Sequence, residues 1–381
     1  MIQRVLNVKR IKLVLIFGLF LTIGLIQIEL TIAEKRNFNI IRIGKFDDGG
    51  RVLGVYVHEH IAYVTDLEQG LEIINVTNKA NSTLVGKFDP HAGEPQNVFI
   101  NGSYAFLANS FDGIRTINIS DPTRPLNVSH YLEKETVIIP FVHEVYTSAS
   151  QDIFIDGSLG YIADGKYGVK VLNLTDLFNP TKIAEYHDEK GISRGIIVNG
   201  SYAYVADGAD GINILDLSDM SNITRIGHHF DGGVAQDLHL VDSYLYVADS
   251  ADGLEILDVS DPTNPIEIGE FYDDSDSALG VFVVGDRAYV ADNVDGLEAY
   301  DISDPTNPVE VGQFYATTGV VGLASDVFVD EDTIYVAFGT QGLEIFTYGT
   351  PSTPVPILPL TFIGIIVLGF GIWIFKGGKS Y

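Results

Sequence analysis

The sequence has no cysteine, one tryptophan and two methionines among 381 residues, and it is poor in basic residues. Without cysteine the chain can form neither a disulfide framework nor a thiol-based active site. There are 23 lysines and arginines against 51 aspartates and glutamates, so the formal net charge is −28. Phosphate would be repelled by such a surface, which excludes nucleic acid as a partner. The acidity suits a solvated surface, a salt-rich medium or divalent cations.

Helical periodicity and the common catalytic motifs are also missing. No 3.6-residue period appears between residues 40 and 348. The H-E-x-x-H zinc helix, the G-x-S-x-G elbow and the phosphate-binding P-loop are absent. We therefore assign no catalytic residue, and the metal ligands, if there are any, stay unknown.

Long apolar runs occur only at the two ends. Basic residues precede an apolar run over residues 13–28, followed by Thr31-Ile32-Ala33. This layout predicts a signal peptide within residues 1–35, with an uncleaved signal anchor as the alternative. Residues 357–375 carry no charge and are long enough to cross a bilayer core of about 30 Å.

The residues around this second run predict the orientation. A proline-rich stalk, residues 350–356, precedes it, and the short tail 376–381 carries Lys376 and Lys379. Positive charge on a short tail favours the cytoplasm. The sequence thus predicts a single-pass membrane protein with residues 36–349 outside the cell.

Residues 36–349 consist of one repeated unit. A glycine before an apolar strand marks its register at Gly70, Gly113, Gly168, Gly211, Gly253, Gly296 and Gly342. Each unit contains four strand signals, with an Asp-Pro-Thr-x-Pro segment or a variant of it before the fourth. Four strands in about 43 residues are typical of a propeller blade. The strand-like residues 39–46 match a fourth strand, and the chain leaves the last unit after its third strand. The sequence therefore predicts an all-β, seven-bladed, monomeric propeller whose last blade is closed by the N-terminal strand.

The repeat also resembles a known family. The motif LEILDVSDPTNP, residues 254–265, is similar to the LVIVD-repeat β-propellers, and the resemblance covers about residues 40–348. It implies the fold, and it implies little about activity, because members of this family mostly lack assigned chemistry.

Candidate binding residues open the first strands, which line the central channel of a propeller. They are Gln96, Gln151, Asp152, Arg194, Gln236, Asp237 and Asp326. Such a ring could bind a small anion or a sugar, or its groups could only bond channel water and neighbouring blades. His239 takes a first-strand place that holds phenylalanine in other units, so we expect it to pack there.

One fourth-to-first connection, residues 132–150, is longer than the others. It contains Phe141, His143 and Tyr146, and it reads either as a binding loop or as a cap over the channel. Other loops on this face are acidic, at residues 47–50, 231–233 and 273–276. Such loops keep Ca²⁺ open as a cofactor. The recurring Asp-x-x-Asp-Gly segments, as in residues 249–253, are interpreted as turns.

Asn-x-Ser/Thr sequons are numerous. The glycosylation candidates are Asn81, Asn101, Asn127, Asn199 and Asn222. Asn75, Asn118 and Asn173 take the place of aspartates in other units, and we interpret them as structural.

These features together favour a non-enzymatic protein of the cell surface. We expect an extracellular, membrane-anchored glycoprotein that binds a glycan or a cell-envelope protein through the mouth face of the propeller. The alternatives are an exported enzyme acting on carbohydrate or another small polar substrate in the channel, and a structural component of the envelope.

Overall fold

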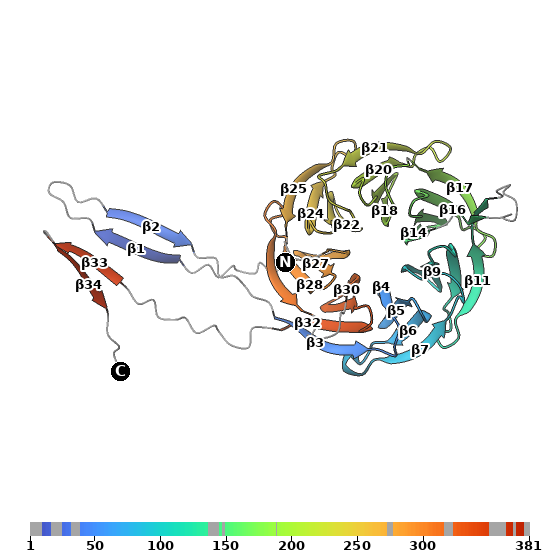
Figure 1. Cartoon of the computed structure of the whole chain (residues 1–381), viewed down its shortest axis with the longest axis horizontal. Coiled ribbons are helices and arrows are strands. Elements are labelled where there is room, and N and C mark those ends of the chain that lie inside the picture. Colours follow the sequence, from blue (N-terminus) through green and yellow to red (C-terminus); the bar gives the residue numbers. More distant parts are fainter. Residues whose placement is uncertain are drawn as a thin grey trace.

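The computed structural model describes residues 10–16, 25–31, 39–135, 145–146, 149–187, 189–272, 277–315, 323–349, 363–368 and 371–376. Residues 39–349 form seven four-stranded antiparallel sheets arranged as the blades of a ring (Figure 1). In each blade the first strand lies next to the central channel and the fourth strand lies at the rim. The predicted all-β, seven-bladed propeller is confirmed.

We number the blades in chain order. Blade 1 contains β4 (Val52–His58), β5 (Ile61–Asp66), β6 (Gly70–Asn75) and β7 (Thr83–Phe88), with the 3-10 turn η1 (Lys79–Asn81) before β7. Blade 2 contains β8 (Asn97–Asn101), β9 (Tyr104–Ala108), β10 (Ile114–Asn118) and β11 (Leu126–Tyr131). Blade 3 contains β14 (Asp152–Asp156), β15 (Leu159–Ala163), β16 (Val169–Asn173) and β17 (Thr181–Tyr186). Blade 4 contains β18 (Gly195–Asn199), β19 (Tyr202–Ala206), β20 (Ile212–Asp216) and β21 (Thr224–His229).

The remaining blades follow the same order. Blade 5 contains β22 (Asp237–Val241), β23 (Tyr244–Ala248), β24 (Leu254–Asp258) and β25 (Ile266–Phe271). Blade 6 contains β26 (Gly280–Val284), β27 (Arg287–Asp292), β28 (Gly296–Asp301) and β29 (Val309–Phe314). Blade 7 contains β30 (Asp326–Asp330), β31 (Thr333–Ala337), β32 (Leu343–Gly349) and β3 (Asn39–Phe46).

The ring closes through β3, as the sequence predicts. This N-terminal strand pairs antiparallel with β32, from Asn39 opposite Gly349 to Phe46 opposite Leu343. The last blade therefore takes its fourth strand from the start of the chain. β3 covers β32 and forms the outer edge of the blade, as the fourth strand does in the other blades.

The backbone conformation and the close packing at the register position require the glycine that marks the repeat. Gly113 and Gly211 both have a φ of +75°, which L side chains rarely adopt. A Cβ on Gly113 would lie 2.2 Å from the carbonyl oxygen of Tyr131, at the end of the fourth strand of the same blade. Glycine is therefore needed where the second strand turns into the third.

The hydrophobic core is divided among the blade interfaces. Seven clusters of buried apolar side chains are formed, and each of them combines residues from two neighbouring blades. Blades 2 and 3, for example, meet through Phe106, Ile153 and Leu172. This arrangement leaves the centre of the ring free for polar groups.

The ends of the chain contain two short strand pairs. β1 (Arg10–Ile16) pairs with β2 (Leu25–Thr31), and β33 (Ile363–Leu368) pairs with β34 (Gly371–Lys376). The described part of residues 357–375 is thus strand and not the expected transmembrane helix. Residues 357–362, 369 and 370 lie outside the described ranges. Among the residues that the structure describes, no helix is long and apolar enough to span a membrane.

Candidate functional site

The ring predicted from the first strands lines one cavity at the mouth of the channel. Its volume is about 170 Å³, and every blade contributes to it. The lining residues are Leu53, Gly54, Gln96, Asn97, Gln151, Asp152, Arg194, Gln236, Asp237, Leu279, Ser325 and Asp326. All seven candidate residues of the ring are therefore brought together. Sites for whole small molecules usually start near 300 Å³, so this cavity fits one small functional group.

The three carboxylates of the ring connect neighbouring blades. Asp152 accepts hydrogen bonds from the backbone amide of Ile153 and, at 2.9 Å, from that of Ile196 in blade 4. Asp237 accepts one at 3.0 Å from Val281 in blade 6. Asp326 accepts from Val327 and, at 2.8 Å, from Val55 in blade 1. Each carboxylate thus fastens the start of its own first strand to the next one.

Glycine alternates with these acids around the ring. The blades that receive a carboxylate have Gly195, Gly280 and Gly54 at the corresponding place. A Cβ on Gly280 would lie 3.0 Å from the Cα of Asp326. The close approach of the neighbouring aspartate therefore requires a residue without a side chain at position 280. Because the number of blades is odd, aspartate and glycine cannot alternate around the whole ring. Asn97 takes the remaining place, and its amide accepts from Val98 and donates to Asp152 at 2.7 Å.

Burial perturbs the protonation of these acids. It raises the pKa of Asp152 and raises the pKa of Asp326 to about 7, against the opposing effect of the backbone amides. Burial and the nearby charge of Asp326 raise the pKa of Asp237 well above its ordinary value. Because their pKa values are raised, these carboxyl groups keep part of their protons near neutral pH, and this reduces the negative charge of the cavity.

Arg194 is the cation of the ring. Its Nε is buried and has no hydrogen-bond acceptor among the described residues, and no ion pair of Arg194 is found there. Burial lowers the pKa of the guanidinium. The amide nitrogens of Gln96 and Gln151 donate to the carbonyls of Glu94 and Ala149, both at 2.9 Å. Their amide oxygens are thereby oriented as acceptors, so the cavity offers one cationic donor and several neutral acceptors.

A layer of rings lies deeper in the channel, two residues along the first strand of every blade except blade 4, which has Ile197 there. Consecutive ring contacts run from Phe154 through Phe99, Tyr56, Phe328 and Phe282 to His239, with centroid separations of 4.5 to 5.8 Å. Burial lowers the pKa of His239 to about 4, so its imidazole is neutral at physiological pH. The prediction that His239 packs in the channel is confirmed.

The insert 132–150 is described only near its two ends. β12 (Lys134–Glu135) pairs with β13 (Val145–Tyr146). Glu133 forms ion pairs with Lys170 at 2.6 Å and with Lys182 at 2.5 Å, which tie the start of the insert to the outer two strands of blade 3. Phe141, His143 and the side chain of Tyr146 lie outside the described residues, so their role as ligand contacts stays a prediction.

The sequons fall into two groups. Asn75, Asn118 and Asn173 each accept a 2.9 Å hydrogen bond from the amide two residues on, as Asp258 does in blade 5, and are structural turn residues. The five glycosylation candidates are all exposed: Asn81, Asn101, Asn127, Asn199 and Asn222. Their exposure is compatible with glycosylation, which stays a prediction.

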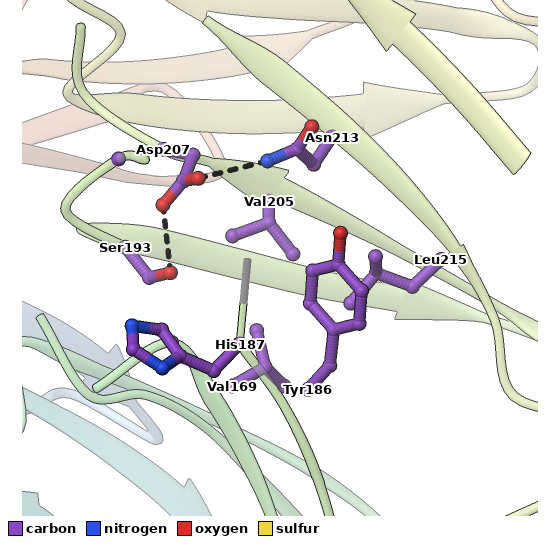
Figure 2. A pocket seen from close by; sticks show the side chains of 10 residues that line it. Val169, Tyr186, His187, Ser193, Val205, Asp207, Asn213 and Leu215 are labelled. Carbon is purple, nitrogen blue, oxygen red and sulfur yellow. Dashed lines mark hydrogen bonds between the residues drawn. The ribbon is translucent and has the colours of Figure 1, made fainter. Parts of the chain in front are cut away.

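A second cavity lies between blades 3 and 4. Asp207 accepts from Ser193 and Asn213 beside it, both at 2.8 Å, as Figure 2 shows. The volume of this second cavity, about 10 Å³, leaves room for no more than one water molecule. It is therefore a packing defect between blades and no ligand site.

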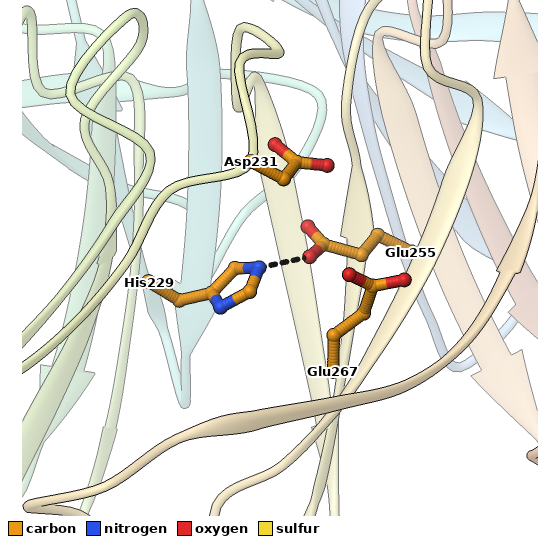
Figure 3. A group of neighbouring side chains, drawn as sticks. All are labelled: His229, Asp231, Glu255 and Glu267. Carbon is orange, nitrogen blue, oxygen red and sulfur yellow. Dashed lines mark ion pairs between the residues drawn. The ribbon is translucent and has the colours of Figure 1, made fainter.

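Sequence reasoning missed a cluster in blade 5. His229, Asp231, Glu255 and Glu267 direct their polar atoms toward one another (Figure 3). The acidic loop 231–233 and the Asp249 turn were interpreted separately, as a mouth loop and as turn chemistry. In the aligned third strands a basic residue stands at the place of Glu255 only in blades 2 and 3, as Arg115 and Lys170.

Comparison with known proteins agrees with this architecture. The LVIVD repeat model matches residues 49–90, 92–133, 190–229, 232–273, 276–316 and 321–355. The structure adds a seventh unit, blade 3, which is preceded by the insert and whose loop over residues 176–180 has Leu177 and Phe178 in place of Pro and Thr.

Among solved structures, the chain is similar to the computationally designed Ika8 protein, with 6% identity and a TM-score of 0.58 over 80% of this chain and 99% of that chain. At this identity the likeness shows the fold alone. No curated protein matches the chain. Since the repeat model covers well over half of the sequence, the chain belongs to the LVIVD-repeat family of β-propellers.

Proposed function

We propose that this propeller is an extracytoplasmic binding module, held at the membrane by the apolar segment 357–375, whose mouth cavity takes a small anionic or polar group of a glycan or of a cell-envelope protein. A repeat-built propeller suggests a binding or interaction module. The membrane anchor and the outside location are supported by the sequence of the two ends.

The choice of the mouth cavity as the binding site rests on one observation. Arg194 presents a guanidinium with a buried Nε that has no acceptor among the described residues. An unsatisfied buried donor costs about 1–3 kcal/mol, so an acceptor group that enters the cavity recovers this energy. A carboxylate or a sugar hydroxyl has the right size and chemistry for a cavity of about 170 Å³.

Binding by the full chain to glycan and envelope-protein panels tests the proposal. Arg194→Gln should weaken binding at least tenfold, because it replaces the charged donor with a neutral amide. Arg124→Gln is the matched control, since Arg124 is exposed in a loop of blade 2. Equal affinity of both variants and the unchanged protein would reject the cavity as the site.

The membrane topology needs its own test. Protease treatment of intact cells should degrade the propeller if it lies outside. Degradation only after the cells are opened would contradict the extracytoplasmic location while leaving the cavity proposal in place.

The raised pKa values of Asp237 and Asp326 support a second candidate, an exported enzyme that uses them as acid and base on a polar substrate. Asp237→Asn would then abolish turnover of a substrate that still binds. Binding without any chemical change of the bound glycans would argue against this alternative.

A further inference from the structure

Most blades bury a charged residue in the third strand, two residues after the glycine that marks the repeat. The residues are Glu72, Arg115, Lys170, Asn213, Glu255, Glu298 and Glu344, in blades 1 to 7. An aspartate or asparagine at the end of the second strand is buried beside them in blades 1 to 6: Asp66, Asn109, Asp164, Asp207, Asp249 and Asp292. Five of the seven blades therefore bury a charged side chain at this place, whereas Arg115 is half-buried and Asn213 is neutral.

Five blades place a lysine or arginine beside this position. In blade 4 it is Arg225, which donates to Asn213 and lies 2.9 Å from Asp210. Lys87 lies 3.8 Å from Glu72 in blade 1, and Arg42 lies 2.8 Å from Glu344 in blade 7. In blade 2 the cation is Arg115, paired with Asp112 at 2.8 Å. In blade 3 the cation is Lys170, at 2.5 Å from Asp164. Close pairing of this kind offsets the high cost of burying a charge, whereas the longer contact of Lys87 with Glu72 does so only in part.

Blade 5 has no such cation in its sequence, since residues 230–286 contain neither lysine nor arginine. Asp249 and Glu255 are 2% and 3% exposed, and the residue opposite Glu255 on the fourth strand is Glu270 where blade 1 has Lys87. Asp231 and Glu267 add two further carboxylates. The positive partner found there is His229, from the fourth strand of blade 4, whose Nε2 lies 2.6 Å from Glu255 (Figure 3).

The donor atoms converge. One ligand atom each of His229, Asp231, Glu255 and Glu267 can be chosen so that all four lie within 4.8 Å of one another. Asp231 belongs also to a second such group, with Asp249 and Asp252. Within the described part of the chain, Oδ1 of Asp249 is buried and has no hydrogen-bond partner.

We propose that blade 5 binds one divalent first-row transition-metal ion of the Zn²⁺ or Mn²⁺ kind, through His229 Nε2 and the carboxylates of Asp231, Glu255 and Glu267. The imidazole nitrogen in the donor set separates this site from the all-oxygen sites of Ca²⁺ and Mg²⁺. Asp249 and Asp252 lie around Asp231 and contribute negative charge to the ion. Asp231 is exposed on the loop between β21 and β22, so an ion can enter from solvent.

Metal titration of the chelator-treated full chain tests this site. Zn²⁺, Mn²⁺ and Co²⁺ should each bind at one ion per chain, measured by calorimetry, and should raise the melting temperature. Bound Co²⁺ should show visible absorption bands. Absence of stoichiometric uptake of all three ions would overturn the proposal, and so would binding of Ca²⁺ alone.

Variants identify the ligands. His229→Ala and Asp231→Asn should each weaken binding at least tenfold, and Asp231 is exposed, so its variant keeps the fold. His228→Ala is the matched control, because His228 is adjacent in the chain, points to the other face of the strand and contacts Asp210. Unchanged affinity in both ligand variants would overturn the assignment. A large loss of metal affinity in His228→Ala would also overturn the assignment, because the loss in the ligand variants would then come from damage to the strand and not from removal of a ligand.

Discussion

The carboxylate of Asp326 in blade 7 accepts a 2.8 Å hydrogen bond from the backbone amide of Val55 in blade 1, 271 residues earlier in the chain. The ring is thus closed twice, at the rim by the pairing of β3 with β32 and at the channel by this bond. The two closures are far apart in the blade, so they can be tested separately.

Asp326→Ala should lower the free energy of unfolding by about 2 kcal/mol, because the amides of Val55 and Val327 lose their acceptor. Urea unfolding measures the change. Asp258→Ala is the control, since that carboxylate caps an exposed turn at Ser260 and should matter much less. Equal losses in the two variants would contradict a special role of the channel bond.

Removing residues 1–46 should abolish cooperative unfolding, because it deletes β3 and leaves β32 as an open edge. It also removes Ile40 and Phe46 from two of the interblade cores. Removing residues 1–38 leaves β3 in place and should leave the propeller melting temperature nearly unchanged. Thermal unfolding followed by circular dichroism compares the two, and identical melting curves would show that strand closure is dispensable.

The folded protein should lose stability as the pH rises, because the buried carboxyl of Glu72 must then ionise. Burial, with the nearby Asp48, raises its pKa from 4.5 to about 8. A carboxyl whose pKa is higher in the folded state favours folding at low pH, and this contribution is lost as the pH rises from about 4.5 to 8. Each unit of pKa difference is worth about 1.4 kcal/mol, so the loss amounts to a few kcal/mol.

Glu72→Gln should remove much of this dependence, since the amide stays neutral. The variant should be more stable than the unchanged protein at pH 8 and about equal to it at pH 5, by denaturant unfolding at both values. The same pH slope in both proteins would show that Glu72 is not the group responsible.

Gly269→Ala should cost about 2 kcal/mol or more. A Cβ there would lie 2.1 Å from the carbonyl oxygen of Pro305 in the next blade, so the two blades would have to separate. The corresponding residue of blade 3 is already Ala184, beside a loop without the Asp-Pro pair. The reverse change, Ala184→Gly, should cost about 1 kcal/mol or less. A tolerated Gly269→Ala would mean that the interblade contact yields easily.

Much of the fold could be predicted because each blade repeats the same local rules. Gly113 and its six counterparts mark a turn that needs positive φ, and this need is local to the chain. The closing strand 39–46 was predicted because it matches other fourth strands and the last unit lacks one. Membership of the mouth cavity, from Gln96 to Asp326, also follows from the repeat, because equivalent positions of a closed ring face the same channel.

The sequence by itself therefore determined the blade count, the closure and which residues face the channel, since these depend on period and on local turn chemistry. Only the tertiary structure decided what those residues contact. The carboxylates of Asp152 and Asp326 bond to amides of the next blade, and Nε of Arg194 has no acceptor among the residues that the structure describes. Likewise, His229 meets Glu255 across two blades, a contact that no spacing along the chain reveals. Charge compensation in a propeller occurs between neighbouring sheets, and it depends on distances of a few ångströms that a one-dimensional repeat does not contain.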